Sequence, residues 1–226
     1  MNIVKFKSDP PLTDFAPTWD YTMGEDFLDL SDTQIQEIKE LIVNKEKDIL
    51  LNTKASNIDG YTGLGSNSIT SRFESFNILN WPNNICKELE SQILLKYKVF
   101  LETLQVKRRN VFIQCWANIL RKNQSMKPHI HSTDPYTYLG GHICITDNNT
   151  ETCYINPINQ LNDPVIHSSK NIPGKITFFQ NNIPHYTTVN KSDQLRITLA
   201  FDIVVEEKLK TYSIERQKNF KEFDHA

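Results

Sequence analysis

The stretch Val111-Phe112-Ile113-Gln114-Cys115-Trp116-Ala117-Asn118-Ile119-Leu120 decides the fold class, because its side chains alternate in character with a period of two. The odd-numbered positions are all hydrophobic and form one face of a strand. The even-numbered face mixes aromatic and amide side chains, which is typical of a strand that faces a barrel cavity holding a polar ligand. The sequence therefore predicts a β-barrel whose interior includes Trp116 and Asn118.

Downstream of this strand, short strand-like runs are separated by Asn, Asp, Gly and Pro. They cover residues 138–146, 152–155, 175–179, 185–189 and 196–205. Several short strands separated by such turn-forming residues predict a jelly roll or a small barrel. The turn signal at residues 190–193 predicts that the last two of these strands form an antiparallel hairpin.

Upstream, the hydrophobic period changes to 3.6, which is typical of amphipathic helices. One apolar stripe predicts a helix over residues 32–51, with Ser31 and Gln34 as a candidate capping box at its start. A second stripe predicts a helix over residues 82–101, which would brace the sheet. The first thirty residues read as an extended arm, and residues 52–80 read as a long ordered loop.

Composition limits the class of protein. A formal net charge of −2 gives no support for a nucleic-acid or membrane-surface partner. The amino terminus lacks the apolar core of a signal peptide, and no run approaches the ~18 apolar residues of a membrane span. The four cysteines form no CxxC pair. These features predict a soluble, reduced, cytoplasmic protein.

The histidines of Lys127-Pro128-His129-Ile130-His131 suggest a metal site. His129 and His131 are two residues apart, so their side chains point to the same side of the backbone. His185, from a distant strand, could complete a facial metal centre. A carboxylate would usually stand where His131 does, so Asp134 is an alternative third ligand. His167, in an Asn/Asp/Ser loop, and the terminal His225 are expected to be ordinary surface residues.

Arg196 begins the last strand and shares its face with Thr198. The planar guanidinium fork and the hydroxyl could together hold a carboxylate. The alternative is an arginine on an exposed strand, paired with Asp193 or Asp202. The spacing leaves both interpretations open.

With these motifs the sequence resembles the 2-oxoglutarate/Fe(II)-dependent dioxygenases. More narrowly, it resembles a bacterial and phage branch of oxygenases that has W-x-N and H-x-H motifs. The resemblance covers roughly residues 60–205. It rests on Trp116-Ala117-Asn118, Pro128-His129-Ile130-His131, Pro173-Gly174-Lys175-Ile176-Thr177-Phe178-Phe179, Pro184-His185 and Arg196-Ile197-Thr198-Leu199-Ala200-Phe201.

The resemblance implies a double-stranded β-helix that binds Fe(II), 2-oxoglutarate and O2 and hydroxylates an unidentified small molecule or peptide, with release of succinate and CO2. The metal positions carried over are His129, His131 and His185. The cosubstrate positions carried over are Arg196 and Thr198, which would grip the distal carboxylate, and Asn118 and Trp116, which would line the pocket. His142 could also reach the cosubstrate, or it could be a core histidine.

The expected architecture is a single α+β domain, mainly β with flanking helices, over residues 1–226. Residues 1–105 would form the arm and the bracing helices, residues 106–206 the double-stranded β-helix, and residues 207–226 a tail or terminal helix.

Two rival functions fit the same residues. One is a cupin-like metalloprotein whose three-histidine iron or zinc centre works without 2-oxoglutarate. The other is a non-enzymatic barrel whose histidines are structural. Release of succinate separates the first rival from the dioxygenase, and metal content separates the second.

Overall fold

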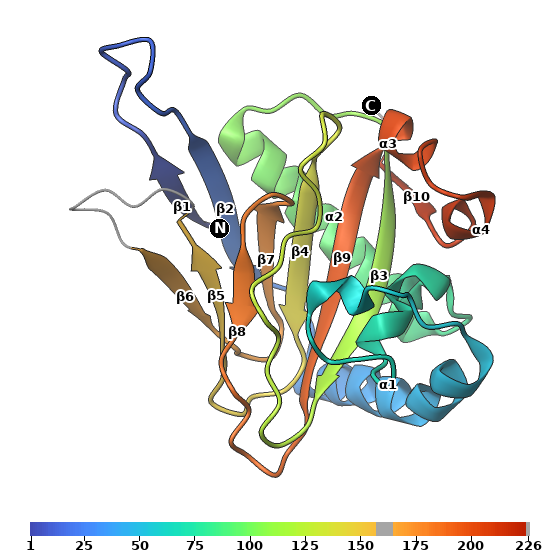
Figure 1. Cartoon of the computed structure of the whole chain (residues 1–226). Helices are drawn as coiled ribbons and strands as arrows, with labels where there is room; N and C mark the ends of the chain where they lie inside the picture. Colours follow the sequence, from blue (N-terminus) through green and yellow to red (C-terminus); the bar gives the residue numbers. More distant parts are fainter. Residues whose placement is uncertain (157–164, 225–226) are drawn as a thin grey trace.

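The computed structural model describes residues 1–156 and 165–224, and within them two antiparallel sheets face each other (Figure 1). The larger sheet has the order β1 (Asn2–Lys7), β2 (Asp20–Phe27), β7 (Lys175–Gln180), β4 (Leu139–Cys144), β9 (Arg196–Val205), β3 (Val111–Leu120) and β10 (Lys221–Asp224). The smaller sheet has the order β6 (Ile166–Lys170), β5 (Glu151–Ile155) and β8 (His185–Thr187). The predicted jelly-roll fold is confirmed.

Strand β3 has the predicted bounds, and its two faces have different surroundings. The odd-numbered residues are buried in the main hydrophobic core. Trp116 and Asn118, on the other face, line a cavity between the sheets. The period-two pattern therefore separates a face that packs on helices from a face that is available to a ligand.

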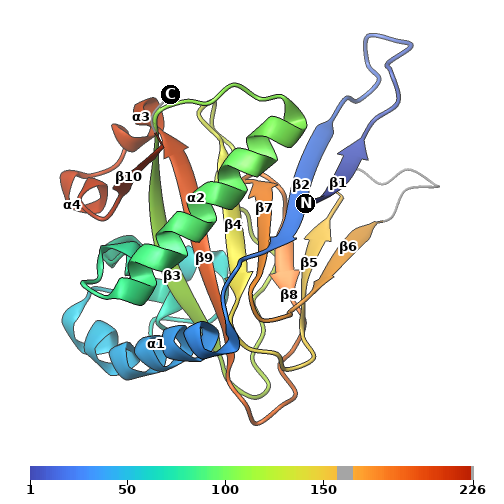
Figure 2. The ribbon, with the colours of Figure 1, turned by 180° about the vertical axis from the view of Figure 1, so that it is seen from behind.

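Two long helices, α1 (Asp32–Asn52) and α2 (Asn84–Leu104), cover the face of the larger sheet that is turned away from the smaller one (Figure 2). The predicted capping box is present, because the Gln34 amide donates to Ser31 Oγ at 3.3 Å and the Ser31 amide donates to Gln34 Oε1 at 2.9 Å. No described helix is long and hydrophobic enough to cross a bilayer.

The amino-terminal segment differs from the predicted extended arm. Its two strands form a hairpin, and β2 pairs with β7, so the arm widens the larger sheet. Helix α2 passes close to β2 here, since a Cβ on Gly24 would lie 2.6 Å from the ring of Phe100. A glycine in β2 therefore lets the helix pass over the added strands.

The predicted hairpin between the last two strands is also wrong. Strand β8 pairs with β5 in the smaller sheet, whereas β9 pairs with β3 and β4 in the larger one. In a jelly roll, a turn can carry the chain from one sheet to the other. His185 and Arg196 consequently reach the cavity from different sheets.

Smaller differences concern the connecting segments. The segment predicted as a loop contains the 3-10 helices η1 (Asp59–Tyr61), η2 (Thr70–Ser75) and η3 (Ile78–Asn80). His167 lies in β6 and not in a loop, and His225 lies outside the described residues. The chain ends with the short helices α3 (Glu206–Leu209) and α4 (Ile214–Gln217) and with β10, which pairs with β3.

Glu25 of β2 connects the two sheets. Its carboxylate accepts a hydrogen bond from His167 Nε2 of β6 at 3.3 Å and forms an ion pair with Lys175 Nζ of β7 at 3.2 Å. Burial opposes the charged form, but the hydrogen bond from His167 and the charge of Lys175 hold the pKa of Glu25 below its usual range.

We therefore expect Glu25→Gln to lower the thermal unfolding temperature at pH 7. A carboxyl group with a depressed folded-state pKa stabilises the fold above its unfolded pKa, and this stabilisation is lost as the pH falls below that value. The difference from wild type should shrink between about pH 5 and pH 2. Exposed Glu37→Gln is the control, and an equal loss at pH 7 and pH 2.5 would contradict the argument.

Candidate metal and cosubstrate site

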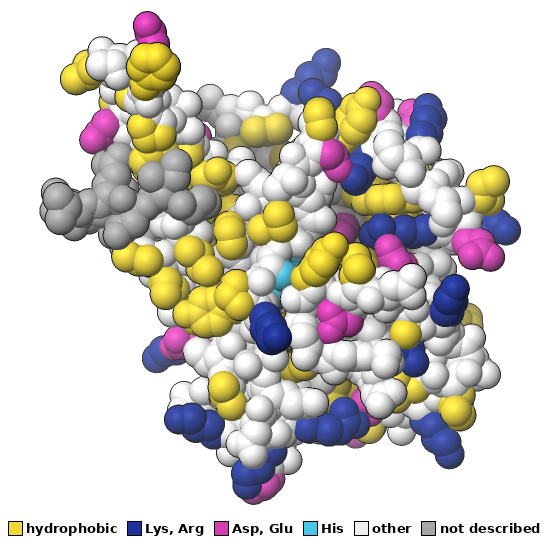
Figure 3. Space-filling model, in the orientation of Figure 1, with side chains coloured by type: hydrophobic (Ala, Val, Ile, Leu, Met, Phe, Trp, Pro, Cys, Tyr) yellow, Lys and Arg dark blue, Asp and Glu magenta, His cyan; other side chains and the backbone are white. Residues whose placement is uncertain are grey.

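A cavity of about 210 Å³ lies between the two sheets. Both sheets contribute side chains to it, and so do η1, η2, α3 and α4 at its rim. A histidine is visible near the middle of the face shown in Figure 3, with hydrophobic side chains beside it. The cavity therefore opens to solvent close to imidazole groups.

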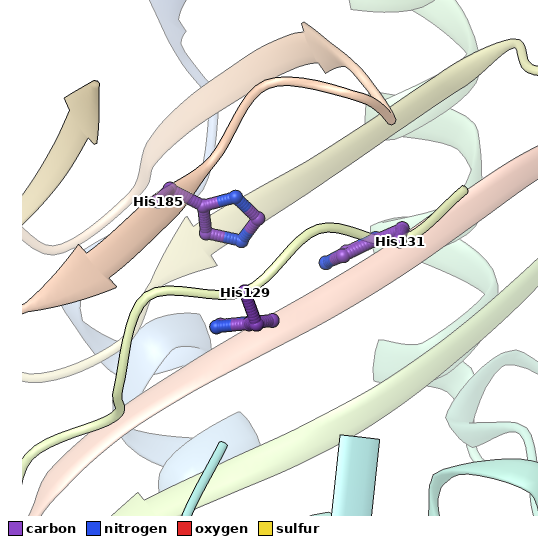
Figure 4. Close-up of side chains that lie close together, drawn as sticks. All are labelled: His129, His131 and His185. Atoms are coloured by element: carbon purple, nitrogen blue, oxygen red, sulfur yellow. The ribbon is translucent and has the colours of Figure 1, made fainter. Parts of the chain in front are cut away.

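His129, His131 and His185 converge in this cavity, as Figure 4 shows. One ring nitrogen from each residue lies within 4.8 Å of those of the other two. An isolated antiparallel bridge sets part of this geometry, because the amides of His129 and His185 each donate to the other's carbonyl at 3.0 Å. The structure thus brings together the three histidines that the sequence singled out.

Hydrogen bonds at Nδ1 determine the tautomer of each ring. His129 Nδ1 lies 2.8 Å from the Lys127 carbonyl, and His185 Nδ1 lies 2.9 Å from the Ile183 carbonyl. His131 Nδ1 lies 2.6 Å from Asp202 Oδ1. All three partners are acceptors, so each Nδ1 carries the proton and each Nε2 keeps a free lone pair. Three such lone pairs suit a divalent transition metal.

Burial also favours the neutral rings that a metal requires. Desolvation, followed by the neighbouring His131, lowers the pKa of His129 to about 4. Desolvation, followed by His129, holds the pKa of His185 well below its ordinary value. These two imidazoles are therefore unprotonated at neutral pH and can bind a cation without first losing a proton.

Asp134, the alternative third ligand, lies outside this cluster. Its carboxylate accepts from Ser132 Oγ at 2.9 Å and from the Tyr136 amide at 2.8 Å, and it pairs with Lys208. The carboxylate is engaged by these three partners and is not part of the histidine cluster. The geometry consequently favours His131 as the third ligand.

Arg196 lies elsewhere in the same cavity and is only 1% exposed. Its Nε donates to Thr150 Oγ1 at 3.1 Å and its Nη2 donates to Thr152 Oγ1 at 3.0 Å. Its Nη1 lies 3.5 Å from Thr198 Oγ1, so arginine and threonine share a face as predicted. Burial lowers the pKa of Arg196 to about 10, which leaves the guanidinium charged at neutral pH.

The surface interpretation of Arg196 is wrong. Asp193 pairs with Lys122 at 2.8 Å, and Asp202 pairs with His131. Among the described residues, no carboxylate lies within ion-pair distance of the guanidinium, whose partners are hydroxyl and amide oxygens. A buried cation is costly unless an anion accompanies it, so this end of the cavity is suited to a carboxylate ligand.

Two further polar groups of the cavity wall have spare hydrogen-bonding capacity. Asn118 is 4% exposed, and its Oδ1 has no described partner. His142 Nδ1 lies 2.8 Å from the Tyr154 hydroxyl, and its Nε2 has no described partner. Burial lowers the pKa of His142 to about 3, so this ring is neutral. Orphaned polar atoms beside Arg196 and the histidines suit a polar ligand.

Sequence reasoning missed the carboxylate of Asp202 and the hydroxyls of Thr150 and Thr152 as parts of the site. Asp202 lies an even number of residues after Arg196 in the same strand, so the sequence could have indicated that both side chains share a face. Thr150 immediately precedes β5 and Thr152 lies in it, two residues apart, and this spacing gave only a weak signal.

The fold and the convergent histidines define a jelly roll whose cavity holds a candidate metal site and a buried arginine. Residues 114–202 match the family described as "Putative 2OG-Fe(II) oxygenase". Among curated proteins, none matches the sequence. The matched segment runs from β3 to β9 and is similar to the 2OG-Fe(II) oxygenases, the superfamily that the sequence resembles, and solved structures share its fold.

Solved structures with a similar fold have very different sequences. A prolyl-4-hydroxylase from Pseudomonas putida has a TM-score of 0.56 at 8% identity, covering 81% of this chain and 92% of its own. The collagen prolyl hydroxylase of Paramecium Bursaria Chlorella virus-1 has a TM-score of 0.52 at 12% identity, covering 81% and 96%. The epimerase SnoN from nogalamycin biosynthesis has a TM-score of 0.53 at 10% identity, covering 81% and 78%.

Fe(II) and 2-oxoglutarate are the metal and the cosubstrate of this superfamily, and the residues present fit both. Three imidazole lone pairs suit Fe(II). The buried Arg196 and the orphaned Asn118 Oδ1 and His142 Nε2 suit a polar dicarboxylate.

Proposed function

We propose that this protein is a dioxygenase that uses Fe(II), 2-oxoglutarate and O2 to hydroxylate a small-molecule or peptide substrate. The observation that carries the proposal is the pairing of two features in one cavity. One feature is the cluster of three histidines, and the other is a buried arginine without a carboxylate partner among the described residues.

In this proposal, His129, His131 and His185 hold Fe(II) through Nε2. When bound, Fe(II) and 2-oxoglutarate supply the activation of O2 for oxidation of a substrate C–H bond, with release of succinate and CO2. The protein supplies binding, orientation and exclusion of water. Each ring is held by its Nδ1 hydrogen bond, so the three lone pairs are oriented before the metal arrives.

Arg196 and Thr198 are proposed to hold the distal carboxylate of 2-oxoglutarate. The three threonine hydroxyls around the guanidinium fix its plane, so little side-chain entropy is lost on binding. Trp116 and Asn118 are proposed to line the pocket. The Trp116 ring centroid lies 5.8 Å from that of His131, so the indole shields one side of the histidine cluster from water.

Two of the similar structures are prolyl hydroxylases by name, which supports hydroxylation as the outcome. An epimerase and a carbocyclase have the same fold, so the fold by itself is compatible with other oxidations. We also propose that the chain forms one domain, because α1, α2 and the larger sheet share one hydrophobic core. A cytoplasmic location is supported by the four buried free cysteines, which suit a reducing compartment.

The test is turnover of 2-oxoglutarate by the purified protein in air with Fe(II) and ascorbate. We expect slow formation of succinate, equal in amount to the 2-oxoglutarate consumed, even without the substrate. His185→Ala is the matched control and should form none. A protein that binds Fe(II) but neither binds nor consumes 2-oxoglutarate would favour the cupin-like rival, and one that binds no metal would favour the non-enzymatic barrel.

A further inference from the structure

The carboxylate that a two-histidine, one-carboxylate iron centre has as a direct ligand is absent here, because His131 stands at that position. We infer that Asp202 supplies the missing negative charge through its hydrogen bond to His131, without binding the metal itself. Asp202 and His131 then act together as one anionic carboxylate–imidazole ligand of the metal centre. This inference rests on the proposed metal site. It assigns Asp202 as a positioning and charge-setting residue that does not touch the metal.

The hydrogen bonds of the three histidines support this asymmetry. The Nδ1 groups of His129 and His185 donate to neutral backbone carbonyls, whereas that of His131 donates to a carboxylate. The distance of 2.6 Å between His131 Nδ1 and Asp202 Oδ1 is short, as in charge-assisted hydrogen bonds. Both side chains are 9% exposed, so solvent screens the pair weakly.

The sheet is shaped to admit this contact. Asp202 faces the cavity from β9, and its register partner on the neighbouring strand β4 is Gly140. A Cβ at Gly140 would lie 3.1 Å from His131 Nδ1 and 2.3 Å from Asn181 Oδ1. Gly140 does not have a positive φ, so its role here is to leave space for the side chains of His131 and Asn181 and not to permit a special backbone conformation.

The backbone positions His131 independently of Asp202. The amides of His131 and Ser132 both donate to the Asn181 carbonyl, at 2.8 Å and 3.1 Å. The Asp202→Asn change keeps the shape of the side chain, removes the negative charge and replaces one carboxylate oxygen with an NH2 donor. It therefore tests the carboxylate as the partner of His131, while the backbone hydrogen bonds of His131 and Ser132 remain.

The experiment compares the full-length wild type, Asp202→Asn and Asp134→Asn. Asp134→Asn is the matched control, because this carboxylate is three residues from His131 in sequence but contacts Ser132, Tyr136 and Lys208. We expect Asp202→Asn to weaken anaerobic Mn(II) binding roughly ten- to hundredfold, as loss of a ligand's outer partner commonly does. The Fe(III)/Fe(II) potential of the iron-loaded protein should become more positive, since the lost charge favoured Fe(III). Asp134→Asn should leave both quantities unchanged.

A wild-type measurement keeps the inference testable if Asp202→Asn does not fold. The carboxylate–imidazole pair requires a slowly exchanging His131 Nδ1 proton far downfield in the proton NMR spectrum of the Zn(II)-loaded protein. Absence of this proton overturns the inference. The inference is also overturned if Asp202→Asn binds Mn(II) as tightly as wild type does in an experiment in which His185→Ala has lost Mn(II) binding. If wild type itself binds no metal, the proposed function fails, and this inference fails with it.

Discussion

His185→Ala is expected to abolish stoichiometric binding of Fe(II) or Mn(II). His185 is 6% exposed and supplies one of three converging nitrogens, so its removal leaves only the two histidines of the H-x-H segment. Two imidazoles without the chelating third ligand do not form the facial arrangement that holds such a metal. The measurement is anaerobic titration of the metal-free protein with Mn(II), with circular dichroism as the check that the barrel is intact.

The third ligand is tested in the same titration. His131→Ala should weaken metal binding severely, whereas Asp134→Ala should have little effect, because Asp134 is held by Ser132, Tyr136 and Lys208. Strong loss of affinity in Asp134→Ala with normal affinity in His131→Ala would reverse the assignment. If neither variant loses affinity, the third ligand lies elsewhere.

Arg196→Ala is expected to raise the dissociation constant for 2-oxoglutarate roughly ten- to hundredfold. A charge-assisted hydrogen bond is commonly worth about 1.5–3 kcal/mol, and the guanidinium is buried where water cannot replace it. Arg196→Lys should recover only part of the loss, because an ammonium group cannot reproduce the planar fork or donate to Thr150 and Thr152 in the same geometry.

The measurement is binding of 2-oxoglutarate to the Mn(II)-loaded protein without oxygen. Thr198→Val is the milder companion, expected to cost about one hydrogen bond, or roughly 0.5–1.5 kcal/mol. Arg121→Ala, which removes an exposed arginine that pairs with Glu46 at 2.9 Å, is the matched control and should leave affinity unchanged. Unchanged affinity in Arg196→Ala would remove the main support for 2-oxoglutarate as cosubstrate.

Local patterns predicted what depends on local physics. The strand over residues 111–120, the shared face of Arg196 and Thr198, and the capping box at Ser31 follow from a period or a spacing within a few residues. The convergence of His185 with the H-x-H segment followed from the order of motifs in a known family. These predictions needed no knowledge of which strands are neighbours.

What could not be predicted depends on pairing between distant segments. The turn after His185 is a good hairpin signal, yet the strands it joins belong to different sheets, and no local residue encodes that choice. The pairing of β2 with β7 could not be predicted either. The acidic residues Glu25 and Asp26 interrupt the hydrophobic pattern of β2, so its sequence does not indicate a strand inside a sheet. Asp202 was missed because its partner His131 lies 71 residues away.

The backbone bridge between His129 and His185 has a consequence for the dynamics of the apoprotein. The bridge lies outside the longer ladders: His129 and His185 share one pair of reciprocal hydrogen bonds, and the Thr187 amide of β8 donates to the Met126 carbonyl nearby at 3.2 Å. Short pairings of this kind open locally far more often than the whole barrel unfolds. A metal bound across both side chains would suppress this opening, so the His129 and His185 amide protons would exchange with deuterium more slowly in the loaded protein, which makes them reporters of metal occupancy.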